Sequence, residues 1–182
     1  MGKVYAAIDD KLAGWLLAQP MYFVGTAPLS GEGHINLSPK GMAGTFAVLG
    51  ERQVGYLDYT GSGAETIAHL RENGRIVLMF CAFDGPPKIV RLHGRGRTVR
   101  PGDAEFAALR ANFAKARTIG QRAIVLIDVD RVSDSCGLSV PTMAFVGDRD
   151  GLDRSQERRD QAYMEQYWQT KNAVSIDGLS AI

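Results

Sequence analysis

Residues 53–75, QVGYLDYTGSGAETIAHLRENGR, contain the change of pattern on which the choice of fold depends. The run QVGYLDY is typical of a β-strand, whereas ETIAHLREN, residues 65–73, is typical of a helix. A glycine-rich turn joins the two runs directly. Such a turn is either a well-formed helix start or a site where free N–H groups hold an anionic ligand.

The residues of this turn support both interpretations. Ser62 and Glu65 have the S-x-x-E spacing of a capping box, which predicts Ser62 as the N-cap of the helix. Thr60, Gly61 and Thr66 add hydroxyls and an unhindered amide to the same helix end, which suits a phosphate. The chain has no G-x-x-x-x-G-K-[S/T] pattern, so the turn is not a nucleoside triphosphate loop.

A second candidate polar surface is the segment HINLSPK, which ends at Lys40. Alternation places Asn36, Ser38 and Lys40 on one side of a strand and Ile35 and Leu37 on the other. We expect the apolar side to join the core. The polar side would then face either water, as is common in antiparallel sheets, or a polar ligand that carries a phosphate.

The segment KIVRLHGRGR places basic side chains on one side of a strand and apolar side chains on the other. We expect Arg95 and Arg97 to be solvated beside acidic neighbours, whereas Arg91 is a candidate contact for an anionic cofactor. Gly94 and Gly96 predict a β-bulge or a close approach of another backbone.

The composition excludes several classes of protein. A net charge of +1 over 182 residues gives no electrostatic footprint for nucleic acid or an anionic membrane surface. A membrane-spanning helix needs about 20 apolar residues, and no apolar run in the sequence approaches that length. The N-terminus has no secretory signal pattern. Two isolated cysteines and the absence of metal-ligand spacings indicate a cytoplasmic protein with no metal site.

The order of the predicted elements favours a barrel over a doubly wound sheet, because short strands follow one another with few helices between them. RIVLMFCAF and KIVRLHGRGRTV form a hairpin through the turn DGPP. We expect one domain over residues 1–182, with a charged helical extension from about residue 150. The other predicted helices cover residues 9–18 and 101–116, and the extension is helical from about 155 to 170.

Three motifs, in order, carry a resemblance to a known family: HINLSPKG, VGYLDYTGSGAETIAHLRENGRIVLMFCAF and PPKIVRLHGRGRTV. Together they resemble the pyridoxamine 5'-phosphate oxidase-like family of flavin-binding split barrels, over about residues 21–132. The resemblance implies a mainly β (α+β) fold, a six-stranded antiparallel split β-barrel with Greek-key order and peripheral helices. It also implies a homodimer with FMN bound at the subunit interface.

The resemblance further implies that Lys40, Thr60 and Thr66 lie at the FMN phosphate. The chain departs from the family's oxidases at several positions: Ile35 replaces an arginine, Ile89 replaces a glutamine, and Ala-Glu-Thr replaces the Ser-Arg-Lys of the phosphate turn. These departures argue against pyridoxamine phosphate oxidase activity itself.

The sequence thus combines a polar binding surface with no recognisable set of catalytic groups, as in proteins whose cofactor carries the chemistry. We expect an FMN-dependent oxidoreductase that acts on a small-molecule substrate. The alternatives are a non-catalytic module that binds flavin or haem, and a deazaflavin-dependent reductase. The predicted cofactor contacts are Asn36, Ser38, Lys40, Tyr59, Thr60, Gly61, Ser62, Thr66 and Arg91.

Overall fold

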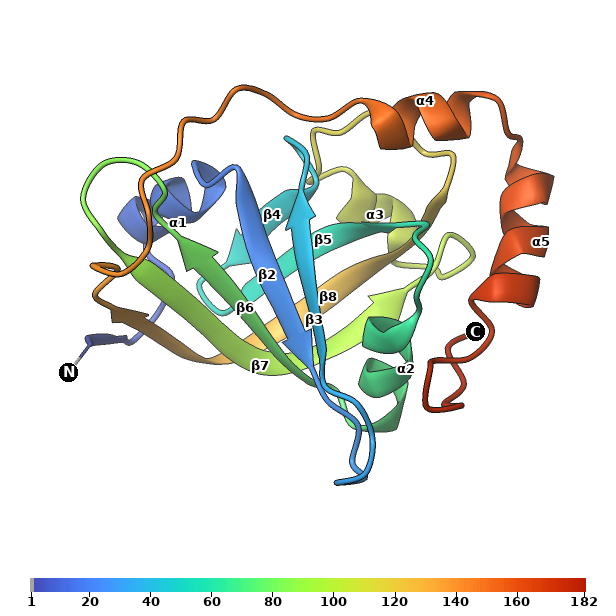
Figure 1. Ribbon diagram of the computed structural model, residues 1–182, viewed down its shortest axis with the longest axis horizontal. Coiled ribbons are helices and arrows are strands. Elements are labelled where there is room, and N and C mark those ends of the chain that lie inside the picture. The colour runs from blue at the N-terminus through green and yellow to red at the C-terminus, as the bar shows by residue number, and fades with distance from the viewer. Residues whose placement is uncertain (1) are drawn as a thin grey trace.

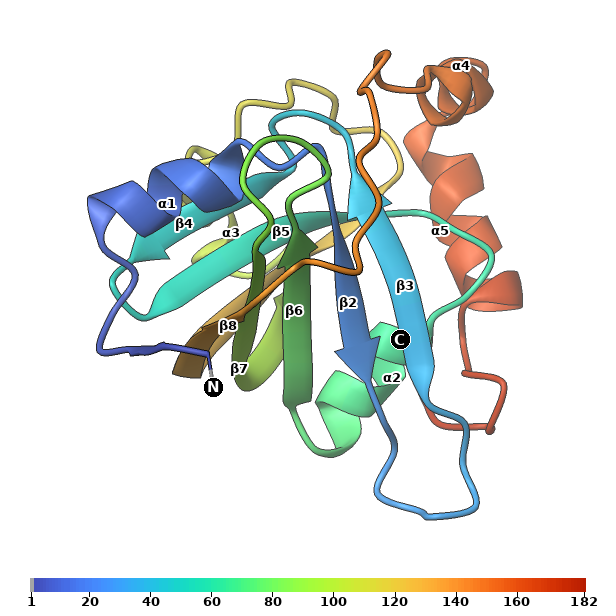
Figure 2. The same ribbon diagram turned by 60° about the vertical axis from the view of Figure 1, so that its left-hand side comes forward.

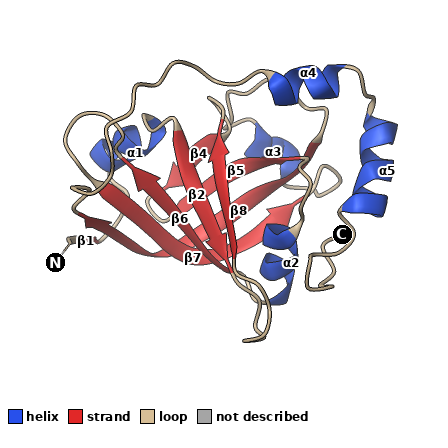
Figure 3. Ribbon diagram, in the orientation of Figure 1, coloured by secondary structure: helices blue, strands red, loops and turns tan. Residues whose placement is uncertain are grey.

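The computed structural model describes residues 2–182, in which one antiparallel sheet of eight strands is surrounded by five helices (Figure 1 and Figure 3). The strands are β1 (Val4–Tyr5), β2 (Met21–Thr26), β3 (Asn36–Gly41), β4 (Phe46–Gly50), β5 (Gln53–Tyr59), β6 (Arg75–Cys81), β7 (Ile89–Val99) and β8 (Gln121–Ser135). The helices are α1 (Asp10–Leu17), α2 (Glu65–Glu72), α3 (Phe106–Arg110), α4 (Gly151–Glu157) and α5 (Gln161–Lys171).

The sheet has the strand order β3-β2-β6-β7-β8-β5-β4, and β1 pairs with β8. Figure 2 shows the sheet curled, with β2 and β3 on one side and β4 and β5 on the other. The predicted antiparallel split barrel is confirmed. The strand count is eight rather than six, in part because residues 4–5 pair with the far end of β8.

The core fills the inside of the curled sheet and is covered at one end by α1. Fully buried side chains such as Tyr56, Phe80 and Leu92 come from β5, β6 and β7, and Leu12 and Leu16 pack onto them from α1. Burial of an apolar side chain of this size stabilises the fold by about 1.5–3 kcal/mol, so this cluster holds the barrel together. The predicted helix over residues 9–18 is confirmed as α1, Asp10–Leu17, which is one residue shorter at each end.

The hairpin of β6 and β7 is also confirmed, with Leu78 opposite Leu92. The register of β7 against β8 shifts between His93 and Gly94, where the backbone of β8 leaves no room for a Cβ. This is the bulge and close approach that the glycine predicts. Arg95 is exposed, as predicted for the later basic side chains of this strand.

Two predicted helices are wrong in length. Only Phe106–Arg110 is helical in the segment 101–116, because the Arg110 guanidinium binds the carbonyls of Phe113 and Arg117 and holds the following chain in an irregular path. The single C-terminal helix expected from about 155 to 170 is two helices. They separate at Asp160, whose carboxylate accepts from the Tyr163 amide 2.8 Å away and caps the start of α5. None of the helices in the described chain has the length and apolar composition that a membrane crossing requires.

Candidate functional site

Within the described residues, two adjoining cavities lie between β3, the end of β5 and the segments that cover them, and a third adjoins them on the side of α1 and β4. The smallest, about 300 Å³, lies between β3 and the turn that leads into α2. The second, about 670 Å³, shares with it Pro39, Lys40, Tyr59 and Gly61. We call these the small cavity and the middle cavity.

The edge strand β3 presents its two faces in the opposite sense to the prediction. Ile35, just before the strand, and Leu37 within it are 81% and 65% exposed. The expectation that this apolar side joins the core is therefore wrong. The polar side faces inward instead, where Ser38 and Lys40 line the small cavity. Because β3 pairs only with β2, alternation along it defines two sides without determining which one is covered.

A chain of polar side chains runs from β3 into the protein interior. The Ser38 hydroxyl donates to Asn36 Oδ1 over 3.1 Å, and Asn36 Nδ2 donates to Thr66 Oγ1 over 3.0 Å and to Thr26 Oγ1 over 3.3 Å. Thr26 Oγ1 lies 2.9 Å from Nδ1 of the buried His69, whose Nε2 has no partner among the described residues. Burial lowers the pKa of His69, which keeps the ring neutral.

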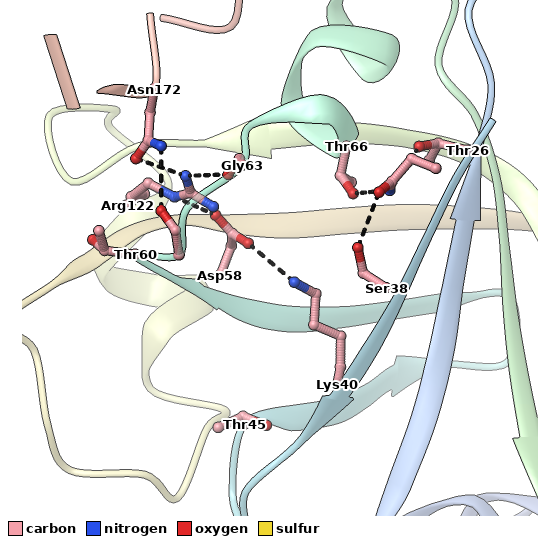
Figure 4. Close-up of polar contacts among 12 residues, drawn as sticks. Thr26, Ser38, Lys40, Thr45, Asp58, Thr60, Gly63, Thr66, Arg122 and Asn172 are labelled. Carbon is pink, nitrogen blue, oxygen red and sulfur yellow. Dashed lines mark hydrogen bonds and ion pairs between the residues drawn. The ribbon is translucent and has the colours of Figure 1, made fainter. Parts of the chain in front are cut away.

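A buried ion cluster lies beside this chain, as Figure 4 shows. Asp58, 2% exposed, accepts from Arg122 Nε over 2.9 Å, and its other oxygen is 3.8 Å from Lys40 Nζ. Arg122 is itself buried. Since an unpaired charge in such a place would be strongly destabilising, the carboxylate and the guanidinium require one another.

The start of α2 differs from the predicted capping box. The helix begins at Glu65, its N-cap is Ala64, and no side chain caps it. Because the N-cap is Ala64, the predicted assignment of Ser62 as N-cap is wrong, and Ser62 is exposed. The Glu65 carboxylate folds back over Gly63 and occupies the space that a Cβ there would need. The S-x-x-E pattern therefore predicts neither the N-cap residue of α2 nor the position of the Glu65 side chain.

The family model for pyridoxamine 5'-phosphate oxidase matches residues 8–136, most of the chain. The chain belongs to the pyridoxamine 5'-phosphate oxidase family. The resemblance drawn from the three motifs is thereby confirmed. The match covers the barrel and ends before α4 and α5.

A curated relative, the pyridoxamine 5'-phosphate oxidase family protein ustO of Aspergillus flavus, is 43% identical over 145 residues. The match covers 79% of this chain and 58% of the relative, so the chain spans less than two thirds of that protein's length. Among solved structures, HupZ of Group A Streptococcus is 20% identical, with a TM-score of 0.56 over 75% of this chain and 99% of HupZ. A conserved protein of unknown function from Corynebacterium diphtheriae is 15% identical, with a TM-score of 0.52 over 75% and 98% of the two chains. At these identities the two structures show the shared fold alone.

The oxidase-family barrel brings most of the predicted cofactor contacts together. Asn36 lies one hydrogen bond behind the small cavity. Thr60 lines the middle cavity, but its hydroxyl donates to the Gly120 carbonyl over 2.7 Å. Arg91 lines none of the three cavities and donates to Ser135 Oγ over 2.9 Å. The predicted residues that line the small cavity are Ser38, Lys40, Tyr59, Gly61, Ser62 and Thr66.

Sequence reasoning missed three side chains of this site: Asp58, Arg122 and Asn172. For the first two a signal exists, because each is a charged residue within an apolar strand pattern, QVGYLDY and RAIVLIDV, and buried charges need a partner. Asn172 follows α5 and bonds to Arg122, more than 30 residues beyond the family match. No pattern in the sequence indicates that contact.

The small cavity has a balanced set of charged side chains. Two cations, Lys40 and Arg122, line it together with two carboxylates, Asp58 and Glu65. Arg122 is held at close range by Asp58, whereas Lys40 is farther from its partner and 27% of its side chain is exposed. Lys40 is therefore the cation that remains available to an anionic ligand.

A third, larger cavity of about 1340 Å³ adjoins the middle cavity and shares Tyr22 and Thr45 with it. The segment 137–150, which we call the strap, contributes Met143, Phe145 and Asp148 to its lining. The strap is attached where the Met143 amide donates to the Phe83 carbonyl over 2.8 Å and where Asp148 accepts from the Ala43 amide over 2.9 Å. The aromatic lining consists of Trp15, Tyr22, Phe46, Phe80, Phe83 and Phe145.

Proposed function

We propose that this chain is an FMN-dependent oxidoreductase of the pyridoxamine 5'-phosphate oxidase family that acts on a small-molecule substrate. The observation that carries the proposal is the juxtaposition of Lys40 with the hydroxyls of Ser38, Ser62 and Thr66 around a cavity at the start of α2. A helix N-terminus offers free N–H groups and a positive dipole, so this end suits the phosphate. The adjoining middle cavity, about 670 Å³, suits the ring in size.

The residues present fit a phosphate ester through donors rather than through a cluster of cations. The paired charges of Asp58 and Arg122 cancel at close range, which leaves Lys40 as the principal attraction. Hydroxyls and turn amides replace the family's arginine and lysine. Each hydrogen bond to a charged group contributes about 1.5–3 kcal/mol, so several such donors can substitute for one lost cation.

When bound, the flavin supplies hydride exchange at its ring, and the protein binds, orients and shields it. Tyr22 and Leu57 line the ring end of the cleft, and Phe145 covers it from the strap. The 1340 Å³ cavity beyond is where we place the substrate. Its aromatic lining favours a substrate with an extended apolar surface.

A second copy of the chain completes this proposal. Ile35 and Leu37 form an exposed apolar surface on an edge strand, which also presents unpaired backbone groups. Adjacent apolar exposure of this kind is typical of a surface that another chain covers. A homodimer built on β3 would bring the partner close to the polar face of the same strand, where the ligand is proposed to lie.

One observation favours a second candidate, a non-catalytic flavin-binding module. The closest charged pair in the small cavity, Asp58 with Arg122, is satisfied internally, and no histidine or cysteine of the described chain lines the cavity as an evident proton donor or acceptor for a substrate. Haem is not favoured, because none of the chain's three histidines lines any of the three cavities in the described residues.

The test is a titration of ligand-free protein with FMN, followed by anaerobic addition of a nicotinamide cofactor. We expect saturable quenching of flavin fluorescence and then bleaching of the flavin absorbance by the reductant. Saturable binding without bleaching by NADH or NADPH would favour the non-catalytic module. The absence of saturable binding would overturn both candidates.

A further inference from the structure

We propose that Asn172 is a positioning residue that holds the turn before α2 in the shape that binds phosphate. The inference rests on the proposed function and assigns a role to the C-terminal segment. Asn172 lines none of the three cavities, and its side chain is fully buried. Its influence on a ligand therefore acts through the turn.

The amide of Asn172 uses both of its polar atoms on the site. Its Oδ1 accepts from Arg122 Nη1 over 2.9 Å, and its Nδ2 donates to the carbonyls of Gly61 over 3.2 Å and Ser62 over 3.4 Å. The same Arg122 nitrogen donates to the Gly63 carbonyl over 2.9 Å. Three consecutive turn carbonyls are thus held by Asn172 and its partner, as Figure 4 shows in part.

The direction of these carbonyls determines the direction of the amides. In a trans peptide the C=O of one residue and the N–H of the next point to opposite sides. Because the carbonyls of Gly61, Ser62 and Gly63 point toward Asn172 and Arg122, the following three N–H groups point the other way. Those amides, of Ser62, Gly63 and Ala64, belong to the turn just before α2 and to residues that line the small cavity, where the phosphate is proposed to bind. Asn172 in this way aligns donors that it does not touch.

The rest of the C-terminal segment fixes Asn172 in place. Trp168 Nε1 donates to Thr60 Oγ1 over 2.7 Å, at the start of the turn, and Met164 is the fully buried residue of α5. Farther along, the Ala181 carbonyl accepts from Arg100 over 3.0 Å. The end of the chain, which follows α5 in Figure 1, packs on α2 through Ala181, which shares a buried cluster with Ile67 and Ala68. The family match ends at residue 136 and does not cover this support.

The experiment compares two probes, FMN and riboflavin, which have the same ring and differ in the phosphate. We expect wild-type protein to bind FMN more tightly than riboflavin. Asn172→Ala should weaken FMN binding at least about tenfold, as expected for lost alignment of donors to a charged group, and leave riboflavin binding within about twofold. A merely structural role would weaken the binding of both probes alike.

Arg100→Ala is the matched control, because it removes a hydrogen bond of the same C-terminal segment that involves none of the three turn carbonyls, and its FMN affinity should stay within about twofold of wild type. If Asn172→Ala does not fold, Trp168→Phe carries the test, with a smaller loss of affinity that is again confined to FMN. An equal loss for FMN and riboflavin, or no loss in a folded variant, would overturn the role of Asn172 alone. Failure of the wild type to prefer FMN would overturn the proposed function and this role together.

Discussion

β3 and β7 have the same kind of sequence, alternating apolar and polar side chains, and the structure uses them in opposite ways. In β7, Val90 and Leu92 are fully buried and Arg95 is exposed. In β3, Leu37 is exposed and the polar side chains of Ser38 and Lys40 line a cavity. Alternation thus predicts that a strand has two faces, but the neighbours of the strand determine which face is covered.

The difference has a functional meaning. β7 has a strand on both sides, so its apolar side is enclosed by the curled sheet. β3 is an edge strand whose inner side is polar and whose outer side is apolar. A polar inner side beside a cavity is expected of a binding site, and an apolar outer side is expected of a surface that a partner covers.

The largest expected effect is a difference in stability between variants at the apolar residues of β7 and of β3. Leu92→Ala should lower the free energy of unfolding by about 2–5 kcal/mol, because it opens a cavity in the core. Leu37→Ala should change it by no more than about 0.5 kcal/mol in the monomer, because the side chain already faces water. Urea denaturation at low protein concentration measures both. Equal losses would contradict the assignment of the two faces.

The next effect concerns the polar face of β3. Lys40→Met should weaken FMN binding by about 1.5–3 kcal/mol, roughly 10- to 150-fold, because it removes the available cation of the small cavity. Arg95→Met, on the exposed end of β7, is the control and should bind FMN like the wild type. Fluorescence titration checks both variants, and an unchanged affinity in Lys40→Met would exclude Lys40 as a phosphate contact.

The outer face of β3 should control self-association. Leu37→Lys should raise the dissociation constant of the proposed dimer at least about tenfold, because burial of one leucine contributes about 1.5–3 kcal/mol. Sedimentation velocity over a range of concentrations measures this, with Val4→Lys on the short β1 as the control. A wild-type chain that stays monomeric at high concentration would rule out this use of the surface.

The smallest effect concerns His69, which is linked to β3 through Thr26 and Asn36. Burial lowers the pKa of His69 in the folded protein, whereas the unfolded chain takes up the proton near pH 6.5. As the pH falls below that value the unfolded state holds more protons, so stability declines toward acid. His69→Gln should show a shallower decline between about pH 7 and 5 in thermal unfolding scans. Parallel curves for the two proteins would contradict this origin of the acid sensitivity.

The sequence predicts the helices and strands of this protein better than it predicts which residues they contact in the fold. Local signals located the strands, the β6–β7 hairpin and the bulge at Gly94, because alternation and glycine act over a few residues. The inversion of β3 and the ion pair of Asp58 with Arg122 depend on contacts between distant strands. Asn172 lies beyond any local signal, since its three bonding partners in the turn and β8 are at least 50 residues away.

The carboxylate of Glu65 over Gly63 has a consequence for how a ligand would enter the small cavity. The protein already carries an anion beside the amides of its own turn. In the proposed site, a phosphate that approaches the backbone of Gly63 would meet this carboxylate, so binding there would exchange one anion for another. The free energy of phosphate binding would then be the difference between the attraction of the turn for the phosphate and its attraction for the Glu65 carboxylate. With a neutral residue at position 65, the phosphate would have no competing anion there.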